Sequence, residues 1–414
     1  MAALVVTAFT LVGASQGNSA NADELVLEQL VSQVRTRNAS ATAAVRRLEA
    51  ARMAIPRARA LPEPAVEMMV EEVPTKLSGG MPMFRFQARQ MFPWFGKRDR
   101  MAAVAAHEAD ARAAQADVTM LDVVAEGKRL YFQLLLNREA RRINRQQREV
   151  IDTVVTIATV RLRSGTGMHH DVLKMQTEAA MVDDELIMLE ADRTEMAGML
   201  NALLDRSADA PVAEPREAWT PIRPLTRAGL VAAAIDRRPE LRAMTAMVGA
   251  ERAMAAAARR EYYPDFMLGL IYDLRMDEPD ALGGMVGLNI PLWIGSRQRL
   301  DVRAAEARAL AFERDRVAMA GMARTEIERQ LARLEASQRR GDLLDSKFVP
   351  LAQQTFDSAL AAFPSGTVDA LELLDALRAL FAQRLARTGV RIQRELALVE
   401  LERVTGVPLE EIAP

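Results

Sequence analysis

The run from Lys97 to Arg163 contains no proline, and this feature constrains the chain more than any other. Alanine is frequent in the run, and alanine is the best helix former. A single helix over it would be on the order of 100 Å long, at 1.5 Å per residue. Because a compact domain cannot hold such a helix, the sequence predicts an elongated and mainly α-helical molecule.

Apolar residues recur in steps of three and four along this run, and again over 172–203. Such spacing is typical of a coiled-coil seam. A Ser-Gly-Thr turn separates the two stretches, which predicts a long antiparallel helical hairpin over 97–204 with its tip at 163–168. A second hairpin with a looser pattern is predicted over 296–404, with its tip at 364–368.

The two hairpins indicate an internal two-fold repeat. Ser164-Gly165-Thr166 returns as Ser365-Gly366-Thr367, and FPWFGKR from Phe92 returns as IPLWIGSR from Ile290. These shared marks are turn residues, so chance similarity between alanine-rich helices is a poor explanation of them. The predicted units, in chain order, are a first repeat at 23–205, a Pro-rich linker at 206–224 and a second repeat at 225–414. Each repeat opens with a predicted helix, at about 24–58 and about 226–260.

Between its first helix and its hairpin, each repeat has two short segments in which apolar and polar residues alternate. The predicted strands cover about 62–73, 81–92, 264–274 and 283–293. This alternation is typical of outer-membrane strands, although a soluble sheet with one wet face would show it as well. A barrel needs about eight strands, and an open sheet edge cannot face lipid. Strands in a membrane would therefore require several chains to share one barrel.

The first residues of the chain resemble a secretory signal. Residues 2–13 are apolar but too few to span a bilayer as a helix, and Ala20-Asn21-Ala22 fits the small-x-small rule for cleavage. We therefore expect a signal peptide over 1–22. No Lys or Arg precedes the apolar run, so a frayed N-terminus is the alternative.

Composition argues against several classes of function. The chain has no cysteine, so we expect neither disulfides, zinc–thiolate sites nor a lipid anchor on cysteine. Its 54 basic and 56 acidic residues nearly balance, so nucleic acid is not an expected partner. The sequence contains no Gly-rich phosphate loop, nucleophile elbow or HExxH motif. We expect no enzyme activity and no cofactor.

Along nearly all of its mature length the chain resembles the TolC-like family of outer-membrane efflux proteins, also called outer membrane factors. The motifs that carry the resemblance are QMFPWFGKR from Gln90, VRLRSGTGMHHDVLKMQ from Val160, LNALLDR from Leu200, RRPELRA from Arg237, YYPDFMLGL from Tyr262, NIPLWIGSR from Asn289 and SGTVDALELLDA from Ser365. The form FPWFGKR is most similar to the heavy-metal branch, whose pumps are of the RND type.

This resemblance implies a homotrimer in the outer membrane of a Gram-negative bacterium. Three chains would give a twelve-stranded transmembrane β-barrel, continued by a periplasmic α-barrel of coiled-coil hairpins. The implied partners are outer-membrane lipid, a periplasmic adaptor (membrane fusion protein) and an inner-membrane RND-type pump. The implied function is a passive exit duct, with metal cations as substrates of the heavy-metal branch.

Other functions fit parts of the pattern. A duct for drug efflux or for type I protein secretion would have the same fold. From different classes, a soluble periplasmic coiled-coil scaffold or a periplasmic metal-binding protein would also use long helices or many methionines.

The resemblance also implies roles for the helical tips, which form the tunnel entrance and meet the adaptor. The corresponding contact residues are Arg161, Gly165, Thr166, Gly366 and Thr367. The two glycines would make the turns in any case.

Shortly after the second tip, family members often narrow the entrance with acidic side chains. Here Glu372 and Asp375 occupy the matching positions, three apart on one helix face. Trimer symmetry would turn each into a ring that favours cations and acts as a periplasmic gate. The alternative is a solvated helix face. The family can place a basic residue two positions after the tip glycine, where this chain has Val368, so the resemblance does not extend to an ion pair there.

Aromatic and turn residues predict a belt and hinge at the membrane interface. Proline would end the strand ladder, and glycine would free the backbone to turn into the helix. The residues are Phe92, Pro93, Trp94, Phe95 and Gly96, with Pro291, Trp293 and Gly295 in the second repeat.

Metal binding has only weak candidates. His169 and His170 are adjacent, so on a helix they point about 100° apart and do not chelate as an i, i+4 pair would. Polar tip residues in water are the alternative. The 23 methionines suit soft metals, but methionine more often fills cores.

Overall fold

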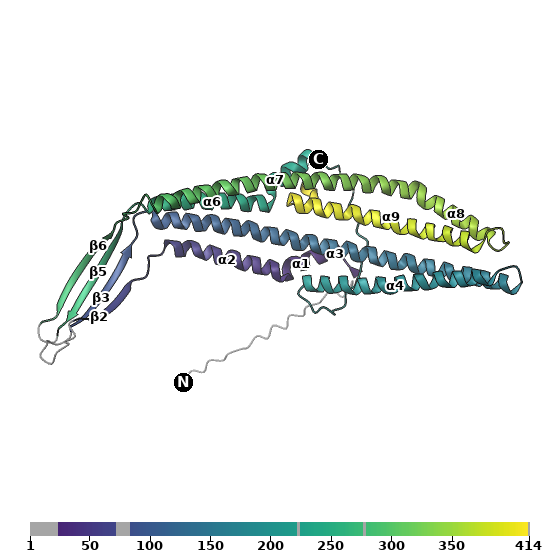
Figure 1. The fold of residues 1–414 in the computed structure, drawn as a ribbon, viewed down its shortest axis with the longest axis horizontal. Coiled ribbons are helices and arrows are strands. Elements are labelled where there is room, and N and C mark those ends of the chain that lie inside the picture. Colours follow the sequence, from purple (N-terminus) through teal and green to yellow (C-terminus); the bar gives the residue numbers. More distant parts are fainter. Residues whose placement is uncertain (1–23, 72–82, 222–223, 276–278, 413–414) are drawn as a thin grey trace, which may run out of the picture.

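The computed structural model describes residues 24–71, 83–221, 224–275 and 279–412. It is an elongated body of long helices with a small sheet at one end and two helical tips at the other (Figure 1). The prediction of a mainly helical chain with a small β part is confirmed. The predicted signal peptide over 1–22 lies outside the described residues, so it stays a prediction.

The two halves of the chain contain similar elements in the same order. The first half comprises α1 (Leu27–Arg37), α2 (Ala39–Arg59), β2 (Ala65–Glu71), β3 (Met83–Phe92), α3 (Lys97–Arg163) and α4 (His169–Leu203). The second half comprises α5 (Arg227–Arg237), α6 (Pro239–Arg260), β5 (Asp265–Leu274), β6 (Ala281–Asn289), α7 (Gln298–Leu343), the π-helical segment η1 (Leu344–Phe348), α8 (Val349–Ala362) and α9 (Ala370–Thr405).

Each half opens with two helices where the sequence predicted one. The first break is at Asn38, whose backbone is extended and whose side chain accepts a hydrogen bond from the Ala41 N–H at 2.9 Å. Asparagine is among the best helix N-caps, so it ends α1 and starts α2. The second break is at Arg238, which precedes Pro239. A residue before proline is disfavoured in helical geometry, which explains the break.

The linker also contains structure that the sequence did not predict. Within 206–224, the two residues of β4, Glu214–Pro215, pair in parallel with β1, Glu24–Leu25. The linker therefore packs against the start of the chain as well as joining the two halves.

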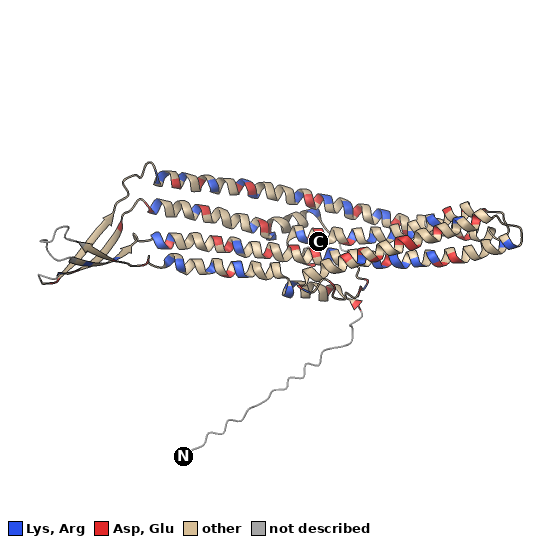
Figure 2. Cartoon of the chain, turned by 60° about the horizontal axis from the view of Figure 1, so that its bottom comes forward, with Lys and Arg blue, Asp and Glu red and all other residues tan. Residues whose placement is uncertain are grey.

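Near the sheet, α2, α3, α6 and α7 lie side by side, and toward the tips the helices draw together (Figure 2). Helix α3 runs the full length, with α2 and then α4 along one flank and α6 and then α9 along the other. Helices α7 and α8 form the outer column beside α6 and α9. We refer to α2 with α4 and to α7 with α8 as the two flanks of this slab. The short helices α1 and α5 pack against these columns, α1 mainly on α3 and α5 on α7 and α9.

The core changes character along the columns. Near the tips, α3, α4, α8 and α9 enclose a large apolar cluster that includes Phe356, Phe363 and Leu373. Near the sheet, the buried residues are mostly alanines, such as Ala105 in α3 and Ala255 in α6. Because alanine side chains are small, the helix axes can lie close together there.

The outer column is not a continuous α-helix, a feature that the predicted hairpin over 296–404 did not include. Segment η1 has π-helical geometry and directly precedes Pro350. Proline lacks an N–H and its ring collides with the carbonyl four residues earlier, here that of Ser346. A π-turn opens the helix at that point and relieves the conflict.

The sheet has the order β2-β3-β5-β6, and every neighbouring pair is antiparallel. Strand β6 ends at Asn289, earlier than the predicted 293, because Pro291 cannot donate to the ladder. Residues 72–73 and 81–82 of the predicted strands lie outside the described residues.

The two faces of the sheet differ in polarity. The register puts Met68, Phe86, Tyr272 and Leu282 in one row on one face. The next row, on the opposite face, contains Met69, Arg85, Asp273 and Ala281, and there Arg85 Nε lies 2.7 Å from Asp273 Oδ1. Within the described residues, no helix is both long and apolar enough to cross a bilayer.

Candidate channel entrance and membrane junction

The two tips contain the same turn. Gly165 has φ of 74° and Gly366 has φ of 80°, values that glycine adopts without a steric cost. In each turn the serine hydroxyl lies beside the threonine hydroxyl, at 2.9 Å for Ser164 and Thr166 and 2.8 Å for Ser365 and Thr367. The structure thus places four of the five predicted contact residues at the exposed ends of the two hairpins (Figure 1).

The fifth predicted contact residue, Arg161, joins the two tips. Its Nη1 donates to the Phe363 carbonyl at 2.7 Å, and its Nη2 donates to the Thr166 carbonyl at 3.2 Å. Its guanidinium also lies 4.9 Å from the centroid of the Phe363 ring. The guanidinium is therefore engaged inside the chain, and contact with an adaptor through this side chain stays a prediction.

The two predicted gate residues lie on the solvent-exposed face of α9. Glu372 lies in the first turn of the helix, where its backbone N–H donates to Asp369 Oδ1 at 2.8 Å, and Asp375 follows one turn later. The opposite face of α9 is buried in the tip cluster through Leu373 and Leu374. In the described chain neither carboxylate forms an ion pair within 4.0 Å, although the charge of Asp375 acts on Arg378 one turn further along the helix. Their role as a gate stays a prediction.

An ion pair next to these carboxylates was missed by the sequence analysis. Arg378 Nε donates to Glu178 Oε1 at 3.0 Å, and a second, shorter bond joins Arg378 Nη2 to Glu178 Oε2. The Glu178 side chain is only 6% exposed. Hydrogen bonding to Glu178 raises the pKa of Arg378 above its ordinary value. The pair fixes α9 to α4, and the only sequence signal was a glutamate beside an apolar stripe.

The weak metal candidates are at the first tip. His169 and His170 start α4 and are exposed, and His170 Nε2 lies 3.2 Å from Asp171 Oδ1. Across the described residues, no group of three or more His, Cys, Asp and Glu side chains is arranged to hold a metal ion.

At the other end of the molecule, the predicted aromatic belt separates into internal and exposed residues. The Trp94 ring is stacked between those of Tyr263 and Phe266, at centroid distances of 5.6 and 5.2 Å. By contrast, Phe95 is 79% exposed and Trp293 is 71% exposed. Phe92 lies on the apolar face of the sheet, opposite Phe266.

The turn residues of the two repeats also differ. After Pro93, Gly96 has φ of 80° and precedes α3, so the turn there requires glycine. Gly295, which follows Pro291 in the second repeat, does not have a positive φ.

A buried lysine secures the junction behind this belt. Lys97 Nζ lies 2.9 Å from Asp265 Oδ1 and 3.0 Å from Glu261 Oε2, and its side chain is 7% exposed. Asp265 also accepts a hydrogen bond from the Trp94 N–H at 2.8 Å. These contacts clamp the start of α3 to the end of α6 and the start of β5. Their only sequence signal was a basic residue after Gly96.

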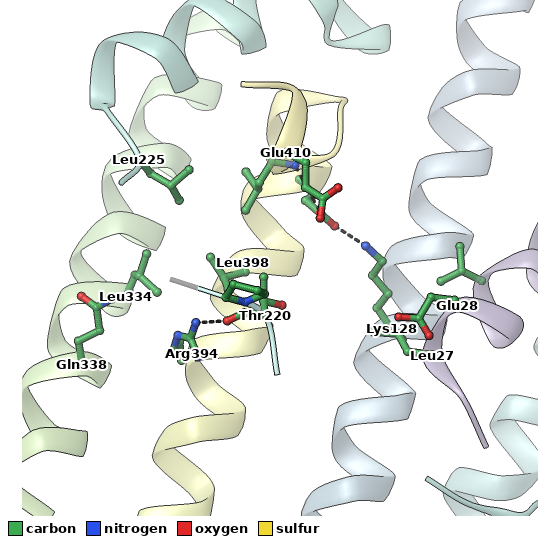
Figure 3. A pocket seen from close by; sticks show the side chains of 14 residues that line it. Leu27, Glu28, Lys128, Thr220, Leu225, Leu334, Gln338, Arg394, Leu398 and Glu410 are labelled. Carbon is green, nitrogen blue, oxygen red and sulfur yellow. Dashed lines mark hydrogen bonds and ion pairs between the residues drawn. The ribbon is translucent and has the colours of Figure 1, made fainter. Parts of the chain in front are cut away.

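A cavity of about 370 Å³ lies mid-way along the body, between α1, α3, α7, α9 and the linker (Figure 3). Lys128 pairs with Glu402 across it, and Arg394 donates to the Thr220 carbonyl. Both basic side chains thus have a partner within the chain. Leucines such as Leu334 and Leu398 supply much of the remaining wall. The arrangement suits holding the linker in place.

Two glutamates anchor this linker in opposite electrostatic settings. Burial acts to raise the pKa of Glu214, but hydrogen bonds and charges from Arg141 and Arg193 outweigh it and lower the pKa. Burial raises the pKa of Glu395, and hydrogen bonds from Thr220 and the nearby Arg394 only partly oppose it. The surroundings of Glu214 therefore stabilise its charged form, whereas the surroundings of Glu395 stabilise its neutral form.

The profile of one family, described as "Outer membrane efflux protein", matches residues 30–205 and 230–407. The chain belongs to the outer membrane efflux protein family. The profile matches once in each half, which supports an internal repeat without demonstrating it.

Three similar proteins illustrate the family. The cobalt-zinc-cadmium resistance protein CzcC of Cupriavidus metallidurans is 25% identical over 393 residues, covering 93% of this chain and 91% of CzcC. The pyoverdine export outer membrane protein OpmQ of Pseudomonas aeruginosa is 25% identical, covering 76% of this chain and 67% of OpmQ. The crystal structure of the outer membrane protein VceC of Vibrio cholerae matches with a TM-score of 0.78 and 20% identity, covering 92% and 96% of the two chains.

The family match confirms the TolC-like resemblance and the efflux function predicted from it, and the likeness to VceC confirms the fold. This outer membrane efflux protein is an exit duct of an efflux system.

Proposed function

We propose that three copies of this outer membrane efflux protein form one channel, which discharges metal cations received from a periplasmic adaptor and an RND-type inner-membrane pump. The observation that carries the metal assignment is similarity along almost the whole chain to a protein named for cobalt, zinc and cadmium resistance. The pump supplies the energy, and the duct supplies a wet passage with an entrance that opens.

The open sheet supports assembly from several copies. One chain contributes four described strands with free edges at β2 and β6, whereas a closed barrel needs about eight. Three copies would supply 3 × 4 = 12 strands. Closure would pair β6 of one copy with β2 of the next, so that no backbone edge faces lipid.

The flanks of the helical slab support the same assembly. Large apolar side chains are exposed on both outer columns, among them Met53 and Ile187 on one flank and Leu310 and Met322 on the other. Since the two flanks differ, the contact between copies would be head-to-tail, and such contacts close into rings.

The two faces of the sheet suit the two sides of a channel wall. The apolar face would meet lipid, whereas the face with Arg85, Asp273, Arg89 and Glu67 would line the lumen. Because those charges form pairs, this part of the wall would carry little net charge and would pass hydrated ions without strong selection. Selectivity for cations would instead come from the carboxylates of Glu372 and Asp375 at the entrance.

The entrance assignment is tested by replacing Glu372 and Asp375 with alanine in one variant. Removal of two carboxylate rings should raise single-channel conductance in planar bilayers and weaken block by divalent cations. Glu49→Ala, which removes an exposed carboxylate of α2 far from the tips, is the control and should change neither property. Unchanged conductance and block in the double variant would reject the acidic gate.

The substrate assignment is tested in cells that lack the gene. The deletion strain should become sensitive to cobalt, zinc or cadmium, and the wild-type gene should restore tolerance. A strain that loses drug tolerance, or secretion of a protein, but keeps metal tolerance would contradict the metal assignment and leave the duct itself intact.

A further inference from the structure

An aromatic groove of about 650 Å³ lies where the helices meet the sheet, and neither the entrance nor the lumen uses it. Its apolar wall includes Trp94, Phe95, Phe266 and Leu268. Arg59, Arg98 and Asp99 stand around its helical side. One side of the groove is thus apolar and the other is charged.

The position of the groove keeps it clear of the strand pairing in the proposed assembly. It lies over β3 and β5, the two central strands, whereas a neighbouring copy would pair with β2 and β6 at the edges. Phe266 and Leu268 belong to the apolar face of the sheet, which would meet the membrane. The charged side follows at the level where α2 ends and α3 begins, so the groove would straddle the boundary between lipid tails and headgroups.

The apolar wall is already rigid. The Trp94 ring is stacked on Phe266 and would lose that contact if it turned, and the backbone N–H of Trp94 is bonded to Asp265, which fixes the main chain beneath the ring. Phe95 meets Trp94 edge-on with the ring centroids 5.9 Å apart, yet it stays mostly exposed. Covering such a preformed aromatic surface with an acyl chain is favourable and needs little reordering.

The charged side has both signs in a fixed arrangement. Arg98 Nη1 donates to the Arg59 carbonyl at 2.8 Å, which holds the two residues together. Arg59 Nε lies 3.9 Å from Asp99 Oδ1, a separation longer than that of a tight ion pair, and both side chains are largely exposed. Two guanidinium groups and one carboxylate therefore remain accessible to a ligand.

We propose that this groove binds a phospholipid with an ethanolamine headgroup. The lipid phosphate would bond to the guanidinium groups of Arg59 and Arg98, which suit phosphate geometry. The ammonium group would face Asp99, and one acyl chain would lie against Phe95 and Phe266. A purely anionic headgroup would bring negative charge near Asp99 and no ammonium group to pair with it, which favours the zwitterionic lipid. This inference rests on the proposed membrane location of the sheet.

The test is native mass spectrometry of the full-length assembly in mild detergent, after incubation with equal amounts of phosphatidylethanolamine and phosphatidylglycerol. The wild type should retain phosphatidylethanolamine in preference. The double variant Arg59→Gln with Arg98→Gln should retain about tenfold less lipid, because it loses charge-assisted bonds to phosphate. Asp99→Asn should shift the preference toward phosphatidylglycerol. Arg46→Gln, an exposed arginine elsewhere on α2, is the control and should behave as the wild type.

Two further outcomes would overturn the proposal. One is lipid retention that the double arginine variant does not reduce. The other is displacement of the lipid by soluble glycerophosphoethanolamine, since the headgroup alone would then account for binding without the aromatic wall. Each sample is first checked for oligomeric state and single-channel conductance. A wild-type sample that does not form a conducting assembly would contradict the proposed channel. A conducting assembly that does not retain lipid selectively would contradict only the proposed lipid site in the groove.

Discussion

The two tips of this efflux protein have the same turn, but the arms that support them differ. On the first arm, α3 reaches its tip as one unbroken helix. On the second, η1 interrupts the outer helix ahead of α8. A short Ser-Gly-Thr motif is thus enough to fix the turn, while the stiffness of each arm depends on residues farther along it. Single π-turns inside α-helices frequently lie at functional sites, and here one lies only on the second arm.

The connection between the tips is also asymmetric. The first tip supplies Arg161, which reaches across to the Phe363 carbonyl of the second. The first arm also supplies Glu178, which holds Arg378 of α9. In both contacts a side chain of the first hairpin, whose helix α3 is unbroken, binds the second hairpin, whose outer helix is interrupted by η1. The first hairpin therefore restrains the second. The predictions below test this asymmetry.

The largest effect is expected from Arg161→Met, which keeps much of the side-chain bulk but removes the hydrogen bond from the guanidinium to the Phe363 carbonyl, which joins the two tips. The loss of this bond should cost about 2 kcal/mol in the docking of the two tips. Proteolysis of the tips should become at least several-fold faster. Arg163→Met, an exposed arginine two residues later, is the matched control. Equal cleavage rates for both variants would show that Arg161 does not restrain the second tip.

A smaller effect, and a sharper comparison, comes from replacing each tip glycine with alanine. An alanine held at positive φ should lower the free energy of unfolding by about 1 kcal/mol at either position. At Gly366 a Cβ would also lie 2.8 Å from Arg161 Nη2, whereas at Gly165 it would meet nothing within 4 Å. Gly366→Ala should therefore lower the midpoint of thermal unfolding more than Gly165→Ala does. In an Arg161→Met background the two substitutions should become equal, and a persistent difference would contradict this explanation.

The smallest effect concerns the linker anchors and depends on pH. Because the pKa of Glu395 is raised in the folded protein, its stabilising contribution is complete below the unfolded pKa and is lost as pH rises through the folded pKa. Glu395→Gln should therefore gain stability relative to wild type as pH rises from 4 to 8. For Glu214, whose pKa is lowered, the contribution is lost as pH falls through the folded pKa, so Glu214→Gln should show the opposite trend. If the stability of both variants relative to wild type changed in the same direction as pH rises, the opposite pKa shifts of Glu214 and Glu395 would be contradicted.

Periodicity and turn residues predicted much of the architecture. The proline-free run, the apolar steps and the Gly turns indicated helices that the structure places at Lys97–Arg163 and His169–Leu203. The alternating segments indicated the strands. These signals are local, because helix and strand periods are set by backbone geometry within a few residues.

Contacts between distant segments could not be predicted in the same way. Nothing local distinguishes Arg161 from Arg163, yet only Arg161 lies within reach of Phe363. Likewise, Lys97 follows Gly96 as an ordinary basic residue, and its burial depends on Glu261 and Asp265, more than 160 positions later. Such pairs depend on how the two halves pack, which one sequence does not specify. The proposed gate residues were reached through the family resemblance rather than through any local signal.

The π-turn also makes the length of the second arm significant. A π-turn contains one residue more than an α-turn, and each residue rotates a helix by about 100°. Deleting a single residue within Leu344–Phe348 would therefore convert the π-turn to an α-turn and leave the angular position of α8 nearly unchanged. Deleting one residue from the regular helix α7 would instead swing every side chain of α8 about 100° around the helix axis, and Phe356 would leave the tip cluster. The π segment is thus the place on this arm where the chain can lose one residue with the least change at the tip.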